Sequence, residues 1–112
     1  MPAMPTDRAE LGRYAESLAA DYLTRRGARV VARNVTTPVG ELDLIADWGD
    51  EAAVVEVRSA RGEDGAERLF TPAKERQVRR VAATLEPPIF RIDVVTVLIG
   101  ARGVRLRWHR RV

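Results

Sequence analysis

The stretch GELDLIADWGDEAAVVEVR, residues 40–58, contains the pattern that decides the fold. Two runs within it alternate between apolar and other residues, as strands with two unlike faces do, and they flank Gly49-Asp50. Glycine adopts positive φ angles easily, so Gly49-Asp50 suits the two-residue loop of a β-hairpin. The sequence therefore predicts a hairpin in which Trp48 pairs with Glu51.

Counting back along this hairpin places Asp43 directly opposite Glu56. Leu42 and Leu44 are expected on the other face of the first strand, and Arg58 on the same face of its strand as Glu56. The Cβ atoms of directly opposed residues lie about 4.5–5.5 Å apart. Two carboxylates at that distance repel one another, so the arrangement requires a cation.

The rest of the chain predicts two helices and three more strands. Thr6-Asp7 caps a helix whose apolar stripe ends near Gly27, and Thr71-Pro72 begins a second helix that ends at Pro87-Pro88. Strands are predicted at residues 28–36, 89–99 and 104–109. The order αβββαββ predicts an α/β fold in which helices flank a mixed sheet.

Composition points to one domain spanning residues 1–112, with residues 1–6 expected to be disordered. A hydrophobic content of 46% suffices for a core. The absence of cysteine excludes disulfides and thiolate metal sites. No segment approaches the length of an apolar membrane span, so we expect a cytoplasmic protein without a membrane partner.

The net charge of +3 is a weak signal, but only one of the 19 basic residues, Lys74, is a lysine. Arginine binds phosphate through a bidentate fork, which suits nucleic acid, although a GC-rich genome also explains the bias. Lys74 continues the buried stripe of the second helix. A cation in the first turn opposes the helix dipole, so Lys74 indicates an anionic partner, either a carboxylate cluster or a phosphate.

Three other charged residues stand out. Glu16 and Arg33 each have two interpretations, and Asp93 requires a hydrogen-bonding partner. Glu16 lies at the edge of the apolar stripe of the first helix, beside the small residue Gly12. A small neighbour would let the helix approach the sheet and direct the Glu16 side chain towards the sheet. Glu16 could equally be half exposed to solvent. Arg33 could reach a phosphate or pair with an acid. Asp93 interrupts an apolar strand, and a buried carboxylate needs an arginine or a backbone donor.

The segment Ser59 to Phe70 is polar, contains glycine and follows the proposed site. A loop that grips substrate would be useful there, whereas composition alone also fits a plain solvated loop.

The combination G-E-x-D-x-I-A, a turn, and V-E-V-(K/R) resembles the core of the YraN-like bacterial proteins. These proteins are placed in the PD-(D/E)XK nuclease superfamily, near the archaeal Holliday-junction resolvases. The likeness covers roughly residues 10 to 98 and also includes Gly12 and Glu16, Arg33-Asn34, Lys74 and the run from Arg91 to Val95. It implies a restriction-endonuclease-like core.

The resemblance also implies a site. Asp43, Glu56 and the backbone carbonyl of Val57 would hold Mg²⁺ or Mn²⁺, and Glu16 would assist. Oxygen ligands of this kind suit such ions. The catalytic residues that the resemblance implies are Asp43, Glu56, Arg58 and Glu16. The expected contacts to nucleic acid are Arg33, Arg58 and Lys74.

Arg58 departs from the superfamily pattern, which has lysine at this position. Arginine stays charged and cannot act as a base, although it can stabilise charge on a phosphate. The leading hypothesis is therefore a Mg²⁺-dependent endonuclease acting on DNA, including branched DNA. The alternatives are a nucleic-acid-binding module that cleaves nothing and a purely structural charge cluster. A second copy of the chain is a further candidate partner.

Overall fold

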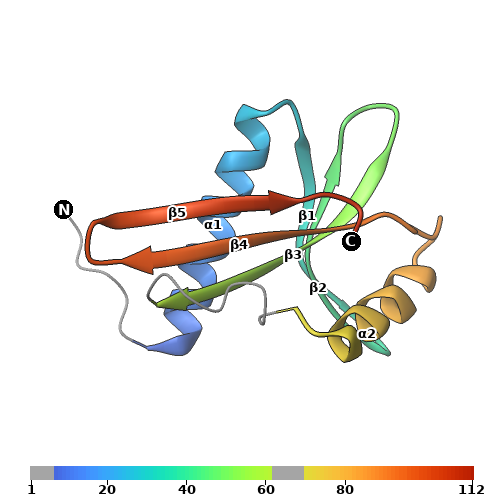
Figure 1. Ribbon diagram of the computed structural model, residues 1–112. Coiled ribbons are helices and arrows are strands. Elements are labelled where there is room, and N and C mark those ends of the chain that lie inside the picture. Colours follow the sequence, from blue (N-terminus) through green and yellow to red (C-terminus); the bar gives the residue numbers. More distant parts are fainter. Residues whose placement is uncertain (1–6, 62–69) are drawn as a thin grey trace.

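The computed structural model describes residues 7–61 and 70–112, and the expectation of disorder at residues 1–6 lies outside them. Along the chain the elements are α1 (Arg8–Arg25), β1 (Arg29–Thr37), β2 (Gly40–Asp47), β3 (Ala52–Arg61), α2 (Pro72–Ala83), β4 (Ile92–Gly100) and β5 (Gly103–His109). Figure 1 shows these two helices around one sheet. The predicted fold class and order αβββαββ are confirmed, and both fit a restriction-endonuclease-like core.

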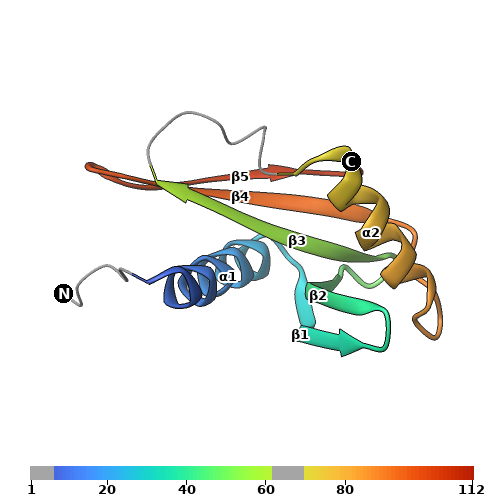
Figure 2. The same ribbon diagram turned by 90° about the horizontal axis from the view of Figure 1, so that it is seen from below.

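The five strands lie in the sheet in the same order as in the chain, β1-β2-β3-β4-β5. Neighbouring strands are antiparallel except β3 and β4, which are parallel. A parallel pair needs a crossover connection, and α2 lies within it. Figure 2 shows α1 on one side of the long strands β3 to β5.

The sheet has an apolar core on each face. Val55 and Val57 of β3 belong to the cluster under α1, whereas Val54 belongs to the cluster under α2 with Val78 and Val81. Successive residues of a strand point to opposite faces, so β3 serves both cores. β4 is buried at every position from Ile92 to Ile99, which confirms the prediction of a strand covered on both faces.

Both helices begin with the predicted caps. The side chain of Asp7 accepts a hydrogen bond from the N–H of Glu10 at 2.9 Å, and the hydroxyl of Thr71 accepts one from the N–H of Lys74 at 3.2 Å. α1 ends just before Gly27, whose φ of 94° suits glycine.

Three predicted boundaries are wrong. α2 ends at Ala83 rather than at Pro87-Pro88, because the N–H groups of Thr84 and Leu85 donate to the carbonyls of Val81 and Ala82 and close the last turn. β4 begins at Ile92 rather than Ile89, because the N–H of Ile89 donates to the carbonyl of Ala82 at the end of α2 and not to the sheet. The segment predicted as a loop from Ser59 instead continues β3 to Arg61, because its backbone finds pairing partners along β4. The remainder of that predicted loop, residues 62–69, lies outside the described residues.

Asp93 is 0% exposed and has the partners that the sequence requires. Arg91 donates to both carboxylate oxygens, at 3.0 and 2.9 Å. The indole N–H of Trp108 and the backbone N–H of Arg111 donate to it as well, at 2.9 and 3.0 Å. Asp93 thus ties the start of β4 to the end of β5.

Among the described helices, none has the length and apolar composition to cross a membrane.

Candidate metal and phosphate site

The two predicted site carboxylates lie where β2 and β3 separate. The backbone pairing of these strands ends at Leu44 and Val55, so Asp43 and Glu56 are the next pair in the predicted register. The N–H of Asp43 donates to Glu56 Oε2 at 3.0 Å, and the N–H of Val57 donates to Asp43 Oδ2 at 2.8 Å. Each carboxylate therefore takes a backbone donor of the opposite strand, which fixes the position of both side chains.

A residue of β1 with left-handed backbone lies beside this point. In the β1–β2 register Asn34 lies opposite Asp43, and its φ of 51° is left-handed. Asparagine adopts this conformation more readily than most residues. Leu42 belongs to the core under α2 and Leu44 to the core under α1. The alternation of burial predicted for β2 is present, with both leucines buried and Asp43 and Ile45 less so, although the two leucines belong to different clusters.

The guanidinium of Arg58 contacts three oxygen atoms of the site. Nη1 donates to the carbonyl of Val57 at 2.9 Å and to Asp43 Oδ2 at 3.4 Å. Nη2 donates to Glu56 Oε1 at 3.2 Å. Asp43, Glu56, Val57 and Arg58 are thus brought together as predicted, and the cation that the paired carboxylates require is a side chain of the protein itself.

Burial makes Glu56 the most unusual of these groups, with only 1% of its surface exposed. Burial raises the pKa of Glu56, and the negative charge of Asp43 raises that pKa further. The hydrogen bond from the Asp43 N–H and the charges of Arg58 and Lys74 act in the opposite direction. Lys74, half-buried in the first turn of α2, therefore acts electrostatically on Glu56.

Glu16 approaches the site from α1. Its pKa is raised by burial and then by Asp43, while a hydrogen bond with Asn34 and the charge of Arg33 lower it. Asn34 is a site residue that sequence reasoning did not assign a role; the signal was an asparagine inside a strand, where this residue is uncommon. Gly12 does not bring α1 close, since a Cβ built there would meet no described atom within 4 Å.

Arg33 is exposed and donates to the hydroxyl of Ser17 on α1 at 3.0 Å. It therefore lies on the Glu16 side of the site, and its predicted contact with phosphate stays a prediction.

Comparison with known proteins gives this chain a family. A family model described as "Uncharacterised protein family UPF0102" matches residues 15–97. A UPF0102 protein of Mycolicibacterium vanbaalenii is 43% identical over 105 residues, which cover 87% of each chain. A UPF0102 protein of Parvibaculum lavamentivorans is 42% identical over 117 residues, covering 97% of this chain and 83% of the relative. The chain belongs to the UPF0102 family. The predicted YraN-like membership is thereby confirmed.

The oxygen atoms of this site fit a divalent cation in their chemistry. Two carboxylate oxygens and one carbonyl oxygen accept from the same guanidinium, and hard cations such as Mg²⁺ prefer oxygen ligands with room left for water. Within the described residues no three side chains of Asp, Glu or His gather into a metal cluster, so Glu16 stands outside the Asp43–Glu56 pair. Asp43, Glu56 and the Val57 carbonyl are the atoms that would hold the ion.

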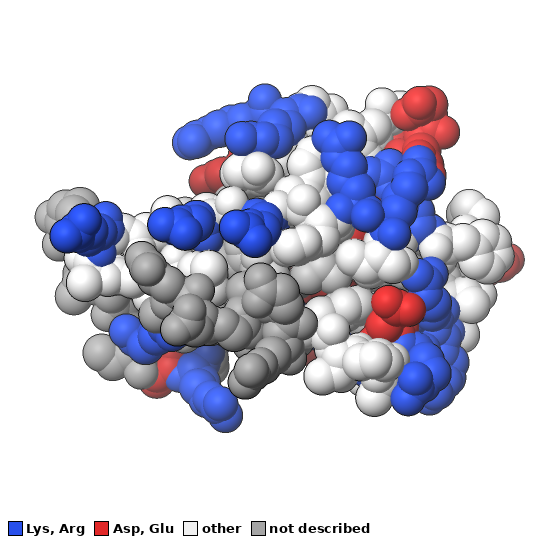
Figure 3. Space-filling model, in the orientation of Figure 1, with Lys and Arg blue, Asp and Glu red and all other residues white. Residues whose placement is uncertain are grey.

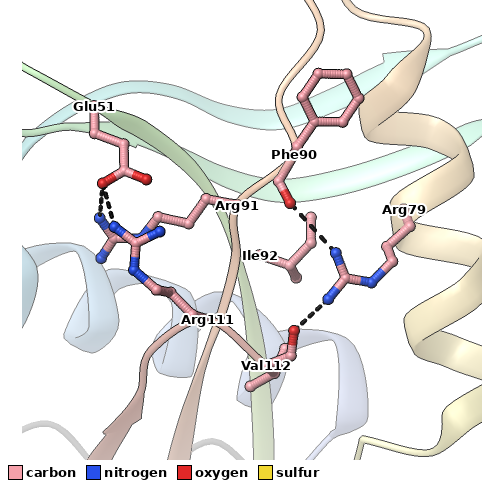
Figure 4. Close-up of a pocket in the computed structure, with 7 residues that line it drawn as sticks. All are labelled: Glu51, Arg79, Phe90, Arg91, Ile92, Arg111 and Val112. Carbon is pink, nitrogen blue, oxygen red and sulfur yellow. Dashed lines mark hydrogen bonds and ion pairs between the residues drawn. The ribbon is translucent and has the colours of Figure 1, made fainter.

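A separate hollow lies where β4 begins and β5 ends, and Figure 4 shows the residues that line it. Its arginines already have partners. Arg91 and Arg111 pair with Glu51, and Arg79 donates to the carbonyls of Phe90 and Val112. These contacts hold the chain end against α2, so this hollow is better explained as a structural clamp than as an anion site.

Proposed function

We propose that this protein is a Mg²⁺-dependent endonuclease that hydrolyses DNA phosphodiester bonds, with Mn²⁺ as a substitute ion. The observation that supports this proposal best is the convergence of Asp43 Oδ2, Glu56 Oε1 and the Val57 carbonyl on one cation. These atoms lie on rigid strands at the point where the sheet opens, which is a suitable place for a preorganised site.

The chemistry that a bound divalent cation supplies to a phosphodiester is neutralisation of phosphate charge and a water of lowered pKa. Asp43 and Glu56 supply the negative charge that retains the ion. Lys74 would place a positive charge beside them for the phosphate, since its ammonium already acts on Glu56. Glu16, on the Asp43 side, would accept a hydrogen bond from the attacking water.

A basic sheet face next to the site supports nucleic acid as the substrate. The register pairs Arg58 with Thr96 and Thr96 with Arg107, so the two arginines share a face about 9–10 Å apart, two strand spacings. Arg105 and Arg107 are exposed, and neither side chain has a hydrogen bond or ion pair within the described residues. In Figure 3 basic side chains gather along β5 and over α2. A DNA backbone crossing this face would run from β5 to the carboxylates.

The test is a cleavage assay with branched, flapped and single-stranded DNA, in Mg²⁺, in Mn²⁺ and in EDTA. The proposal requires cleavage of at least one substrate that depends on the metal. Asp43→Asn, purified in the same way, keeps the shape of the side chain but removes its charge and should be inactive. Activity that survives Asp43→Asn would assign the cleavage to another protein or another site.

A second candidate function is nucleic-acid binding without cleavage. It is favoured by Arg58, which replaces the superfamily's lysine with a group that stays charged and cannot act as a base. DNA binding without metal-dependent cleavage of any of the three substrates would support this candidate over the first. Absence of both activities would leave the charge cluster with a structural role.

A further inference from the structure

The position of the Arg58 guanidinium leads to an inference about how the site is regulated, which rests on the proposed metal site. We propose that Arg58 is an internal competitor of the divalent cation. It occupies the cation position in the free protein and must leave before an ion can bind.

The first argument is identity of ligands. The guanidinium donates to Asp43 Oδ2, Glu56 Oε1 and the Val57 carbonyl, which are the same three oxygens that would hold the ion. Mg²⁺ requires its ligand oxygens at about 2.0–2.1 Å in a nearly octahedral arrangement. A guanidinium bonded to all three oxygens fills that space, and its positive charge repels the ion. Occupation by Arg58 and by metal are therefore mutually exclusive.

The second argument is charge balance. Glu56 is 1% exposed, and the Arg58 side chain is only 20% exposed, so solvent screens little of the electrostatic repulsion between the two carboxylates. Without a cation the repulsion between Asp43 and Glu56 would be unscreened. Arg58 thus stabilises the metal-free site, and the same contacts lower its affinity for metal.

The third argument is that the Arg58 side chain has an alternative position near Phe70. Its guanidinium carbon lies 5.9 Å from the centre of the Phe70 ring, at the outer limit of a cation–π contact. A side-chain rotation towards Phe70 would free the three oxygens. It would leave the guanidinium on the sheet face that it shares with Arg107, where a phosphate could bind it.

The experiment measures Mg²⁺ and Mn²⁺ binding by calorimetry in the absence of DNA, so cleavage is not the readout. Arg58→Met keeps an unbranched apolar stem but removes the guanidinium and its charge. We expect this variant to bind the ion about tenfold more tightly than the wild type, or better, because charge-assisted bonds no longer compete. Arg25→Met removes one charge from an exposed position at the end of α1 and should leave the affinity unchanged.

The outcomes separate this inference from the proposed function. An affinity in Arg58→Met that is equal to or weaker than that of the wild type would overturn the competitor role and leave the metal site in place. Binding in neither protein would remove the metal site itself and both proposals with it. If Arg58→Met does not fold, the wild type still gives an answer by nuclear magnetic resonance. Its Arg58 Nε–H signal must shift as diamagnetic Mg²⁺ saturates the protein, and a signal that does not change would overturn the inference.

Discussion

Glu56 and Arg58 show how single residues define this site. The sequence predicts the Asp43–Glu56 pair and the side of the strand on which Arg58 lies, because a two-residue hairpin loop and strand alternation fix both. It does not predict that Arg58 contacts all three candidate metal ligands. That geometry depends on the exact point where β2 and β3 separate, and no local pattern encodes such a point.

The raised pKa of Glu56 predicts how stability depends on pH. Because the folded-state pKa lies above its ordinary value of 4.5, the folded protein binds more protons in the interval between the two values. The contribution of Glu56 to the free energy of unfolding therefore falls as pH rises through that interval, by at most about 1.4 kcal/mol per pH unit. Glu16 contributes with the same sign.

Urea unfolding at several pH values between about 5 and 8 measures this dependence. Glu56→Gln should show a smaller loss of stability with rising pH than the wild type. Asp21→Asn, at an exposed position of α1, should retain the wild-type slope. Equal slopes for Glu56→Gln and the wild type would contradict the assignment of a raised pKa.

The identity of the basic residue at position 58 predicts a change in activity. Arg58→Lys provides a smaller point charge with an adjustable pKa that fills less of the cation position. If the site is a nuclease site, this variant should cleave DNA faster than the wild type in Mg²⁺, by about an order of magnitude or more. Adding Asp43→Asn should abolish the activity of either protein, and a slower Arg58→Lys enzyme would show that the guanidinium itself serves the reaction.

Among the elements, those with strong local signals are the ones that sequence predicts well. Asp7 and Thr71 cap their helices, and the Gly49-Asp50 loop sets the register of β2 and β3, with the N–H of Trp48 bonded to the Glu51 carbonyl at 3.0 Å. The errors occur where tertiary contacts override local preference. The polar end of β3 is one such place, since pairing with β4 extends it to Arg61.

Two glycines test how closely the helices approach the sheet. Gly40 has a φ of 149°, and a Cβ there would lie 2.9 Å from Cγ2 of Val81 on α2. Gly40→Ala should therefore lower the free energy of unfolding by about 1–3 kcal/mol. Gly12→Ala has free space in the interior of α1 and should raise it by about 0.5–1 kcal/mol.

Tryptophan fluorescence during urea unfolding suits this comparison, since Trp48 and Trp108 stack with their ring centres 5.6 Å apart. A Gly40→Ala protein as stable as Gly12→Ala would mean that α2 does not approach β2 as closely as the structure has it.

At the scale of the whole molecule, the fold class and element order follow from the sequence, because alternation, capping and the run of apolar residues in β4 all agree. The basic face does not follow from composition, since a net charge of +3 hides the distribution of charge. It emerges only when pairing of β3, β4 and β5 brings Arg58 and Arg107 to one face.

This face predicts the salt dependence of DNA binding. Each phosphate contact that is lost should lower the slope of log K against log salt by about 0.9 on duplex DNA. Arg105→Gln/Arg107→Gln should therefore have a slope shallower by up to twice that amount, whereas Arg8→Gln/Arg25→Gln on α1 should match the wild type. Fluorescence anisotropy with labelled DNA measures these slopes. A double variant with the wild-type slope would place the DNA on another face.

The most direct test of the central claim is the position of Mn²⁺ in crystals of the wild-type protein, located by its anomalous scattering. The account predicts one ion bound by Asp43, Glu56 and the carbonyl of Val57, with the Arg58 side chain turned away from all three. Crystals grown in saturating Mn²⁺ that keep Arg58 bonded to these oxygens, with the ion absent or bound elsewhere, would contradict it.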